Sequence, residues 1–159
     1  ATCFRFFTVY GPFGRPDMAY FKFTKSILEE KTINVHNNGN MMRDFTYIDD
    51  LIKSINLLMV KKPEDGVTFL NDSLSPSAPF RVINIGNSKK ISLTNFISCL
   101  EDILNKKAKL KFVPNKTGEL IETFSSSDLL FQITGFKPNT DIDYGLSQFV
   151  EWYKKYYNI

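Results

Sequence analysis

The segment from Arg5 to Asp17 reads R-F-F-T-V-Y-G-P-F-G-R-P-D, a run of strand-forming residues that stops in a turn. Its first half is rich in Phe, Val and Tyr, as in a strand buried on both faces of a parallel sheet. Gly11, Pro12, Gly14 and Pro16 then force the backbone to turn. Ligands of open α/β sheets bind where a strand ends in this way. The segment therefore predicts a sheet strand that leads into a ligand-binding loop.

Two polar side chains of this segment are candidates for ligand contact. Thr8 offers a hydroxyl near the end of the strand, and Arg15 offers a planar guanidinium that suits a carboxylate or a phosphate. Spacing alone favours the alternative that Arg15 is a solvated loop arginine, which is the commoner case.

Composition indicates a globular protein and excludes several partners. A chain of 159 residues fits one domain with a buried core. The net charge of +3 is low and no basic stripe appears, so no nucleic-acid partner is expected. No apolar run is long enough for a membrane span, so no membrane partner is expected either. Cys3 and Cys99 lack the spacing of metal ligands, which predicts no metal site and reduced thiols in a cytoplasmic protein.

Periodicity predicts helices and strands that alternate along the chain. Helices are expected at 19–30, from 49, from 92, at 126–133 and from 141. Strands are expected at 4–10, 33–36, 43–47, 80–86 and 109–113. Phe4–Tyr10 and Arg81–Ile85 should be parallel strands of one sheet. Residues 62–79 are rich in Pro, Gly, Ser and Asp, which predicts a partly mobile surface loop within a single domain.

Three finer expectations concern a helix face, the ends of helices and the exposure of a strand. The helix from Asp49 has apolar residues at relative positions 0, 1, 4, 7 and 8, which predicts one buried face made of Leu51, Ile52, Ile55, Leu58 and Met59. Ser92 and Asp141 are predicted to cap the helices that follow them, and Gly135 to end the helix before it. Lys109–Val113 alternates like a half-exposed strand.

A longer pattern resembles a known family. The segment R-F-F-T-V-Y-G-P-x-G-R-P-D-M-A from Arg5 is similar to the one that follows the catalytic Tyr-Lys pair in extended short-chain dehydrogenases/reductases. The match continues through R-D-F-T-Y-I-D-D from Arg43, N-I-G from Asn84 and G-F-K-P from Gly135 to Trp152-Tyr153. It resembles most narrowly the UDP-glucuronate 4-epimerases among the NAD-dependent nucleotide-sugar epimerases and dehydratases.

The resemblance implies an α/β fold, the C-terminal part of an extended Rossmann-type epimerase. Residues 1–159 would be its substrate-binding half, made of the last parallel strands and the substrate-binding lobe. The sequence contains neither a glycine-rich dinucleotide motif nor Tyr-x-x-x-Lys. We therefore expect that the N-terminal NAD-binding half is absent, that no catalytic residue lies in this chain and that it is inactive alone. NAD would be the cofactor of the intact enzyme.

The resemblance also assigns substrate contacts. In the family, NAD⁺ takes a hydride from C4 of the sugar and returns it to the other face of the 4-keto intermediate. Thr8 and Arg15 would contact the sugar carboxylate, Arg43 the pyrophosphate, and Val35 and His36 the uracil, although His36 stands where Tyr is usual. A fixed hydroxyl and guanidinium would hold the carboxylate of the 4-ketouronate, a β-keto acid, in an orientation that resists loss of CO₂.

Further positions follow from the same resemblance. Val9 and Pro12 would lie beside the nicotinamide of the cofactor. Asp17, Met18 and Ala19 enter a helix whose first N–H groups could meet a phosphate.

Some positions leave alternatives open. Arg43 could equally pair with Asp44 or Asp49. Thr117-Gly118-Glu119 stands in place of the family's Pro-Gly-Asp, and Ser126 in place of its Asp, so no ligand role is assigned to residues 115–126.

Three functions fit the sequence. The first is the substrate-binding portion of an epimerase acting on UDP-glucuronate, which the combination of Thr8 with R-P-D-M from Arg15 favours. The second is a fragment of a related nucleotide-sugar dehydratase or decarboxylase, and the third a stand-alone, non-catalytic module that binds a nucleotide sugar or a protein. Without the N-terminal half of the family fold, Cys3–Tyr10 would expose apolar side chains and a strand edge, which predicts a homo-oligomer through this region.

Overall fold

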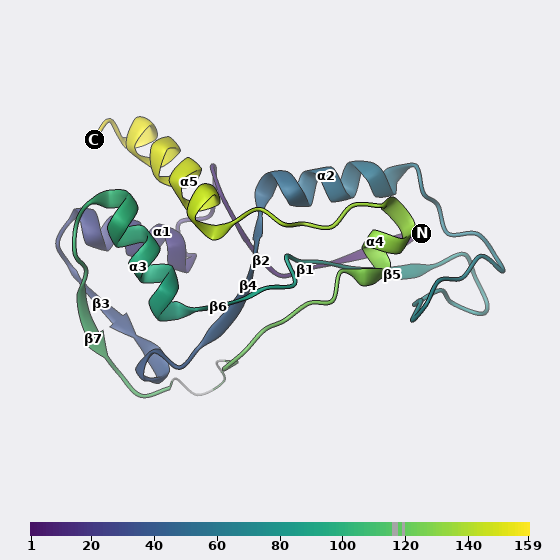
Figure 1. The fold of residues 1–159 in the computed structure, drawn as a ribbon, viewed down its shortest axis with the longest axis horizontal. Helices are drawn as coiled ribbons and strands as arrows, with labels where there is room; N and C mark the ends of the chain where they lie inside the picture. Colours follow the sequence, from purple (N-terminus) through teal and green to yellow (C-terminus); the bar gives the residue numbers. More distant parts are fainter. Residues whose placement is uncertain (116–117, 119) are drawn as a thin grey trace. The chain divides into compact units, whose positions relative to one another are not determined.

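The computed structural model describes every residue except 116, 117 and 119. Helices and strands alternate, which confirms the α/β class (Figure 1). The strands are β1 (Thr2–Phe6), β2 (Thr8–Tyr10), β3 (Thr32–Val35), β4 (Met42–Tyr47), β5 (Arg81–Ile85), β6 (Lys90–Ser92) and β7 (Lys109–Phe112). The helices are α1 (Ala19–Leu28), the 3₁₀ helix η1 (His36–Gly39), α2 (Ile48–Met59), α3 (Leu93–Leu104), α4 (Asp128–Thr134) and α5 (Ile142–Tyr157).

The chain forms two compact units, each built from three separate segments. Unit 1 comprises Ala1–Val9, Asp44–Lys89 and Phe124–Thr140. Unit 2 comprises Tyr10–Arg43, Lys90–Thr123 and Asp141–Ile159. Strand β4 passes from unit 2 into unit 1 between Arg43 and Asp44.

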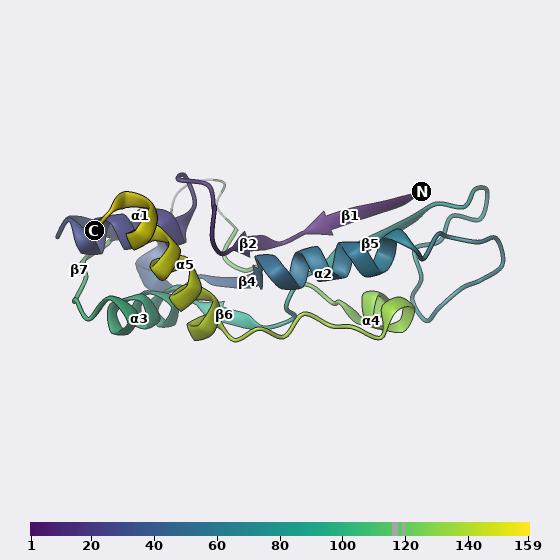
Figure 2. The ribbon, with the colours of Figure 1, turned by 90° about the horizontal axis from the view of Figure 1, so that it is seen from above.

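Unit 1 is organised around two parallel strands. β1 pairs with β5 in register from Thr2 opposite Arg81 to Phe6 opposite Ile85, which confirms the predicted parallel pairing (Figure 2). The strand β5 alternates buried and half-buried residues, and the helices α2 and α4 pack with it. The buried core of this unit consists of Leu51, Leu58, Ile83, Ile85 and Leu130.

The first predicted strand is shorter and less buried than its composition suggests. β1 ends at Phe6, and Thr8–Tyr10 forms the separate strand β2, whose sheet has the order β2-β4-β6. The cause lies in the partner strand, because β5 ends where Gly86 lies against Ser125. Phe6 is 48% exposed, so burial on both faces was a wrong prediction for this strand.

Unit 2 has an aromatic core between helices. Tyr20 and Phe21 of α1 contact Phe149 of α5 with ring centroids 4.8 and 5.8 Å apart, and α3 packs against both helices. The strands β3 and β7 pair in parallel, from Thr32 opposite Lys109 to Val35 opposite Phe112. Aromatic side chains in such edge-on contacts add stabilisation beyond their buried area.

The ends of three helices test the cap predictions. Ser92 accepts a hydrogen bond from the backbone N of Asn95 at 3.1 Å, which confirms it as the cap of α3. Gly135 ends α4 with φ +69°, a left-handed conformation that favours glycine, as predicted. Asp141 precedes α5 as expected, but its side chain makes no capping hydrogen bond there.

Two burial predictions were wrong. Ile52 and Met59 of α2 are 47% and 74% exposed instead of facing the core. Helix α2 turns Asp50 inward, where its carboxylate accepts hydrogen bonds from the backbone N of Asn139 and Thr140 at 3.1 and 2.9 Å. All four residues of β7 are exposed, since β3 supplies the buried side chains of that pair.

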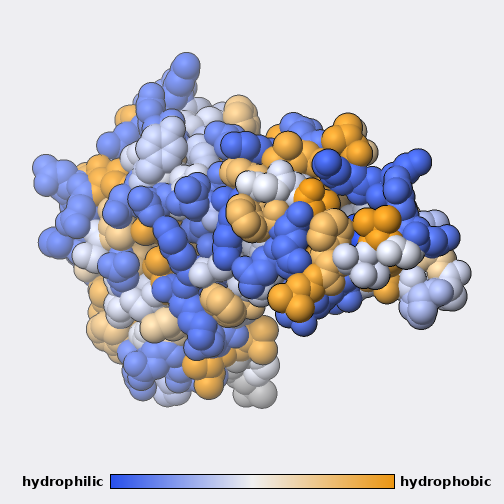
Figure 3. Space-filling model, turned by 45° about the vertical axis from the view of Figure 1, so that its right-hand side comes forward, coloured by the Kyte–Doolittle hydropathy of each residue, from blue (hydrophilic) through white to orange (hydrophobic). Residues whose placement is uncertain are grey.

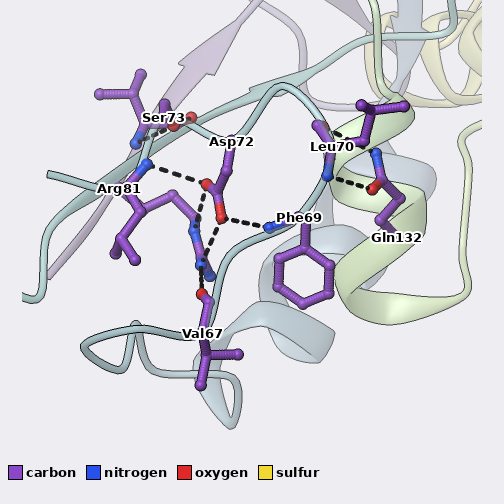
Figure 4. A network of polar contacts seen from close by, with 9 residues as sticks. Val67, Phe69, Leu70, Asp72, Ser73, Arg81 and Gln132 are labelled. Carbon is purple, nitrogen blue, oxygen red and sulfur yellow. Dashed lines mark hydrogen bonds and ion pairs between the residues drawn. The ribbon is translucent and has the colours of Figure 1, made fainter. Parts of the chain in front are cut away.

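The loop predicted at residues 62–79 is tethered by a buried ion pair (Figure 4). Arg81 donates to both carboxylate oxygens of Asp72 at 2.8 Å and to the carbonyl of Val67 at 3.0 Å. The side chains of Arg81 and Asp72 are only 3% and 4% exposed. Gln132 of α4 exchanges hydrogen bonds with the backbone N and O of Leu70. Residues 62–79 lie between α2 and β5, and their partial mobility stays a prediction.

No helix among the residues that the structure describes is both long and apolar enough to cross a lipid bilayer.

Candidate functional site

The loop after β2 presents Arg15 to solvent. Arg15 donates from Nε to Oδ1 of Asp17 at 3.1 Å and from Nη2 to Oδ2 at 2.8 Å. Nη2 also lies 3.6 Å from Sδ of Met18. The two charged side chains are 74% and 63% exposed. This is the two-point geometry with which an arginine binds a carboxylate, made here with a carboxylate of the chain itself.

Aromatic contacts hold this loop on unit 2. A Cβ at Gly14 would lie 2.0 Å from the hydroxyl oxygen of Tyr20, so only glycine allows this approach. Phe13 has φ +61° and is 82% exposed, and its ring centroid lies 5.3 Å from that of Trp152. Burial raises the pKa of Tyr20 above its ordinary value, so this phenol keeps its proton at neutral pH. The predicted turn is therefore a loop in which Phe13 and Gly14 pack against aromatic side chains, while Arg15 is exposed to solvent.

Arg43 is held by backbone carbonyls. Its Nη1 donates to the carbonyls of Met42 and Ile121 at 2.8 and 3.1 Å, and its Nη2 donates to the carbonyl of Leu120 at 2.6 Å. Among the described residues these hydrogen bonds replace the alternative of pairing with Asp44 or Asp49. A guanidinium has five N–H donors, so these three contacts leave two donors without a partner among the described residues, one of them on Nε. Such donors can bind the oxygens of a phosphate.

Asp44 of the same motif is structural. It is fully buried and accepts hydrogen bonds from the backbone N of Asn87 and Ser88 at 2.9 and 3.1 Å. It also accepts from the backbone N and the hydroxyl of Ser125 at 3.0 and 2.6 Å. The carboxylate thus fixes the turn after β5 and the segment before α4.

The two residues predicted to line the uracil differ in exposure. The side chain of Val35 is 0% exposed, so only its backbone is available to a ligand. His36 is half-buried and begins the helix η1 instead of ending β3. Its Nδ1 atom is buried and has no hydrogen-bond partner among the described residues.

The remaining predicted positions lie in both units. Thr8 and Val9 are half-buried in β2 and belong to unit 1, whereas Pro12, Met18 and Ala19 are half-buried in unit 2. Met18 caps α1 without a side-chain hydrogen bond, and Ala19 is the first residue of that helix. The structure thus brings Arg15, Asp17 and Met18 together. Arg43 belongs to the same unit but is distant from them in the sequence.

Sequence reasoning missed the segment that holds Arg43. Leu120 and Ile121 contribute only backbone carbonyls, and a carbonyl leaves no signature in the residue type. The departure at Thr117-Gly118-Glu119 concerns residues of which 117 and 119 lie outside the described part of the chain.

A cavity of about 450 Å³ in unit 1 contains none of the predicted site residues. Its lining includes Lys61, Lys62, Phe69 and Arg81. The guanidinium of Arg81 is already paired with Asp72. No cluster of three metal-binding side chains occurs within the described residues.

Comparison with known proteins gives the family. Residues 1–86 match the model of the NAD dependent epimerase/dehydratase family. The chain is 44% identical to a probable UDP-glucuronate 4-epimerase of Rhizobium meliloti, covering 98% of this chain and 47% of that protein. It is 42% identical to UDP-glucuronate 4-epimerase 5 of Arabidopsis thaliana, covering 98% of this chain and 36% of that protein.

A solved structure extends the likeness to the fold. The UDP-glucuronic acid 4-epimerase of Bacillus cereus, in complex with UDP-glucuronic acid and NAD, superimposes with a TM-score of 0.81 at 32% identity. The match covers 97% of this chain and 45% of that protein. The chain thus spans about half the length of the bacterial relatives it matches. Sequence and fold agree that this chain belongs to the NAD dependent epimerase/dehydratase family.

Proposed function

We propose that this chain is the substrate-binding portion of an NAD-dependent nucleotide-sugar epimerase that inverts C4 of UDP-glucuronate through a 4-keto intermediate. The observation that carries the proposal is Arg43, whose guanidinium is fixed by the carbonyls of Met42, Leu120 and Ile121 with two donors left over. A diphosphate supplies oxygens that can accept hydrogen bonds from those two donors.

Arg15 supports a uronate over a neutral sugar. It already holds the carboxylate of Asp17 at two points, so it can hold a sugar carboxylate in the same way. In the proposed site, Thr8 would add a hydroxyl to that carboxylate. The 4-keto intermediate of a uronate is a β-keto acid, and a carboxylate fixed by charge-assisted hydrogen bonds is less free to reach the orientation in which CO₂ departs.

The residues of this chain would contact only part of the cofactor. NAD would take the hydride from C4 and return it. Val9 and Pro12 are half-buried and apolar, which suits the flat face of a nicotinamide ring. Neither residue offers a charged group to the phosphates of the cofactor, so this chain would contribute only to the nicotinamide end. Met18 and Ala19 would instead serve the substrate, with N–H groups at the start of α1 directed to its phosphates.

The uracil would lie beside Val35 and His36. Because the Val35 side chain belongs to the core, its contribution would come from the backbone. The imidazole of His36 would provide a flat face for the base. We also retain a cytoplasmic location as part of the proposal.

Arg43→Ala is expected to weaken UDP binding by about tenfold or more, because a hydrogen bond to a charged group is worth about 1.5–3 kcal/mol. Isothermal calorimetry with UDP compares the two proteins, and affinity of the unmodified chain is expected to be weak. Lys111→Ala is the matched control, since it removes one exposed positive charge from the same unit. Equal affinities for the unmodified chain and Arg43→Ala would remove Arg43 from the site and overturn the proposal.

The chain is also expected to form a dimer or higher oligomer. Cys3 and Phe6 of β1 are exposed, and β1 pairs with β5 along one edge. Apolar side chains also lie among polar ones on the surface in Figure 3. Uncovered apolar area and strand edges recruit partners. Light scattering at micromolar concentration measures the mass, and Phe6→Lys should shift it toward the monomer. A monomer from the unmodified chain would contradict this expectation.

A further inference from the structure

The strand that carries Arg43 begins in a small backbone ladder. The N of Met42 donates to the carbonyl of Ile121 at 2.9 Å, and the N of Thr123 donates to the carbonyl of Met42 at 3.1 Å. These two bonds form a parallel bridge between Met42 and Glu122. The guanidinium of Arg43 then binds the carbonyls of Leu120 and Ile121. One short segment, 120–123, therefore fixes both the backbone and the side chain at this point.

An ion pair ties that segment to the next strand. Nζ of Lys90 lies 2.5 Å from a carboxylate oxygen of Glu122, with the two side chains 40% and 50% exposed. Lys90 begins β6, which leads into the capped start of α3 at Ser92. The N of Leu93 donates to the carbonyl of Met41 at 2.9 Å, so α3 also binds the chain just before β4.

These contacts order the guanidinium of Arg43 before any ligand binds. An arginine free to rotate would have to be ordered by its ligand, and binding would be weaker by that entropy. With three of its N–H groups bound to carbonyls, the guanidinium keeps one orientation, and its remaining N–H groups are fixed with it. Any contact that keeps segment 120–123 in place therefore keeps the phosphate-binding edge of Arg43 in place.

We propose that Glu122 and Lys90 are positioning residues for the diphosphate, acting through segment 120–123 on the guanidinium of Arg43. Neither side chain needs to touch the ligand. The inference rests on the proposed function for the identity of the ligand, but not for the order that the ion pair imposes on Arg43.

The first experiment measures order without a ligand. Side-chain ¹H–¹⁵N NMR follows the Nη N–H groups of Arg43 that donate to Leu120 and Ile121, and their exchange with water. Glu122→Ala should speed that exchange several-fold, and the swapped pair Glu122→Lys with Lys90→Glu should restore it. Glu151→Ala on α5 removes one exposed carboxylate of the same unit and should change nothing. Unchanged exchange in Glu122→Ala would overturn the inference.

The second experiment measures coupling with UDP and with inorganic pyrophosphate. Glu122→Ala should weaken both about threefold in the presence of Arg43 and should have no further effect in an Arg43→Ala background. An additive loss would show that Glu122 acts independently of Arg43, which overturns the positioning role. If Arg43→Ala leaves UDP binding unchanged, the proposed function fails instead, and the NMR result still decides whether the ion pair orders Arg43.

Discussion

The 159-residue chain, supplied with NAD⁺ and UDP-glucuronate, is expected to give no measurable epimerase activity. Epimerisation needs a group that moves the proton of the sugar hydroxyl, and such acid–base groups typically contribute about 10²–10⁴-fold to the rate. The family's Tyr-x-x-x-Lys does not occur, because none of the seven tyrosines is followed four residues later by a lysine. Chromatography of the nucleotide sugars after long incubation measures the product.

A complementation experiment tests whether activity appears when the rest of the enzyme is added. The part of the Rhizobium relative outside the matched region, produced together with this chain, should give activity if the two associate. That activity should fall about tenfold or more in Arg15→Ala and stay unchanged in the control Lys111→Ala, because a charge-assisted contact to the substrate is lost only in the first. Turnover by the 159-residue chain alone would show that it carries a catalytic group that its motifs do not reveal.

Asp44→Ala is expected to destabilise unit 1 by about 3–5 kcal/mol, a large share of the roughly 5–15 kcal/mol that stabilises an ordinary domain. The carboxylate is 0% exposed and accepts hydrogen bonds from Asn87, Ser88 and Ser125. Its removal leaves buried N–H groups without an acceptor. Urea denaturation followed by circular dichroism measures the free energy of unfolding.

The control for this prediction is Asp65→Ala, which removes a carboxylate from an exposed position of the same unit. Surface substitutions of that kind usually change stability by less than about 0.5 kcal/mol. A loss below about 1 kcal/mol in Asp44→Ala would show that water enters the site and replaces the carboxylate oxygens.

The sequence predicts most of the fold because its signals are local. Ser92 caps α3 and Gly135 ends α4, since each needs only its own residue type and its neighbours. The break after Phe6 has no such signal, because it depends on the partner strand β5, which ends at Ile85 just before Gly86. The face of α2 was misjudged because periodicity counts apolar residues and overlooks Asp50, which is buried by hydrogen bonds to a distant segment.

The candidate site was predictable in part for the same reason. The resemblance identifies the family, which the comparison confirms, and it selects Arg15 and Arg43 as ligand residues, which stay predictions. The partners of Arg43 could not be predicted, since Leu120 and Ile121 act through backbone oxygens. Pairing of Arg15 with Asp17 required the conformation of the loop, which the residue order alone does not give.

The division of each unit into three separate segments has a consequence for synthesis. The hydrogen bond between Asp44 and Ser125 can form only after residue 125 has been synthesised. The hydrogen bond between Asp50 and Thr140 must wait for residue 140 in the same way. Unit 1 can therefore close only after residue 140 has been synthesised, and unit 2 only after its last segment, Asp141–Ile159, has followed. Contacts so distant in sequence slow folding, because loops must close before they yield any stabilisation. Until then each unit is incompletely packed, a state in which apolar surface is open to aggregation and to chaperones.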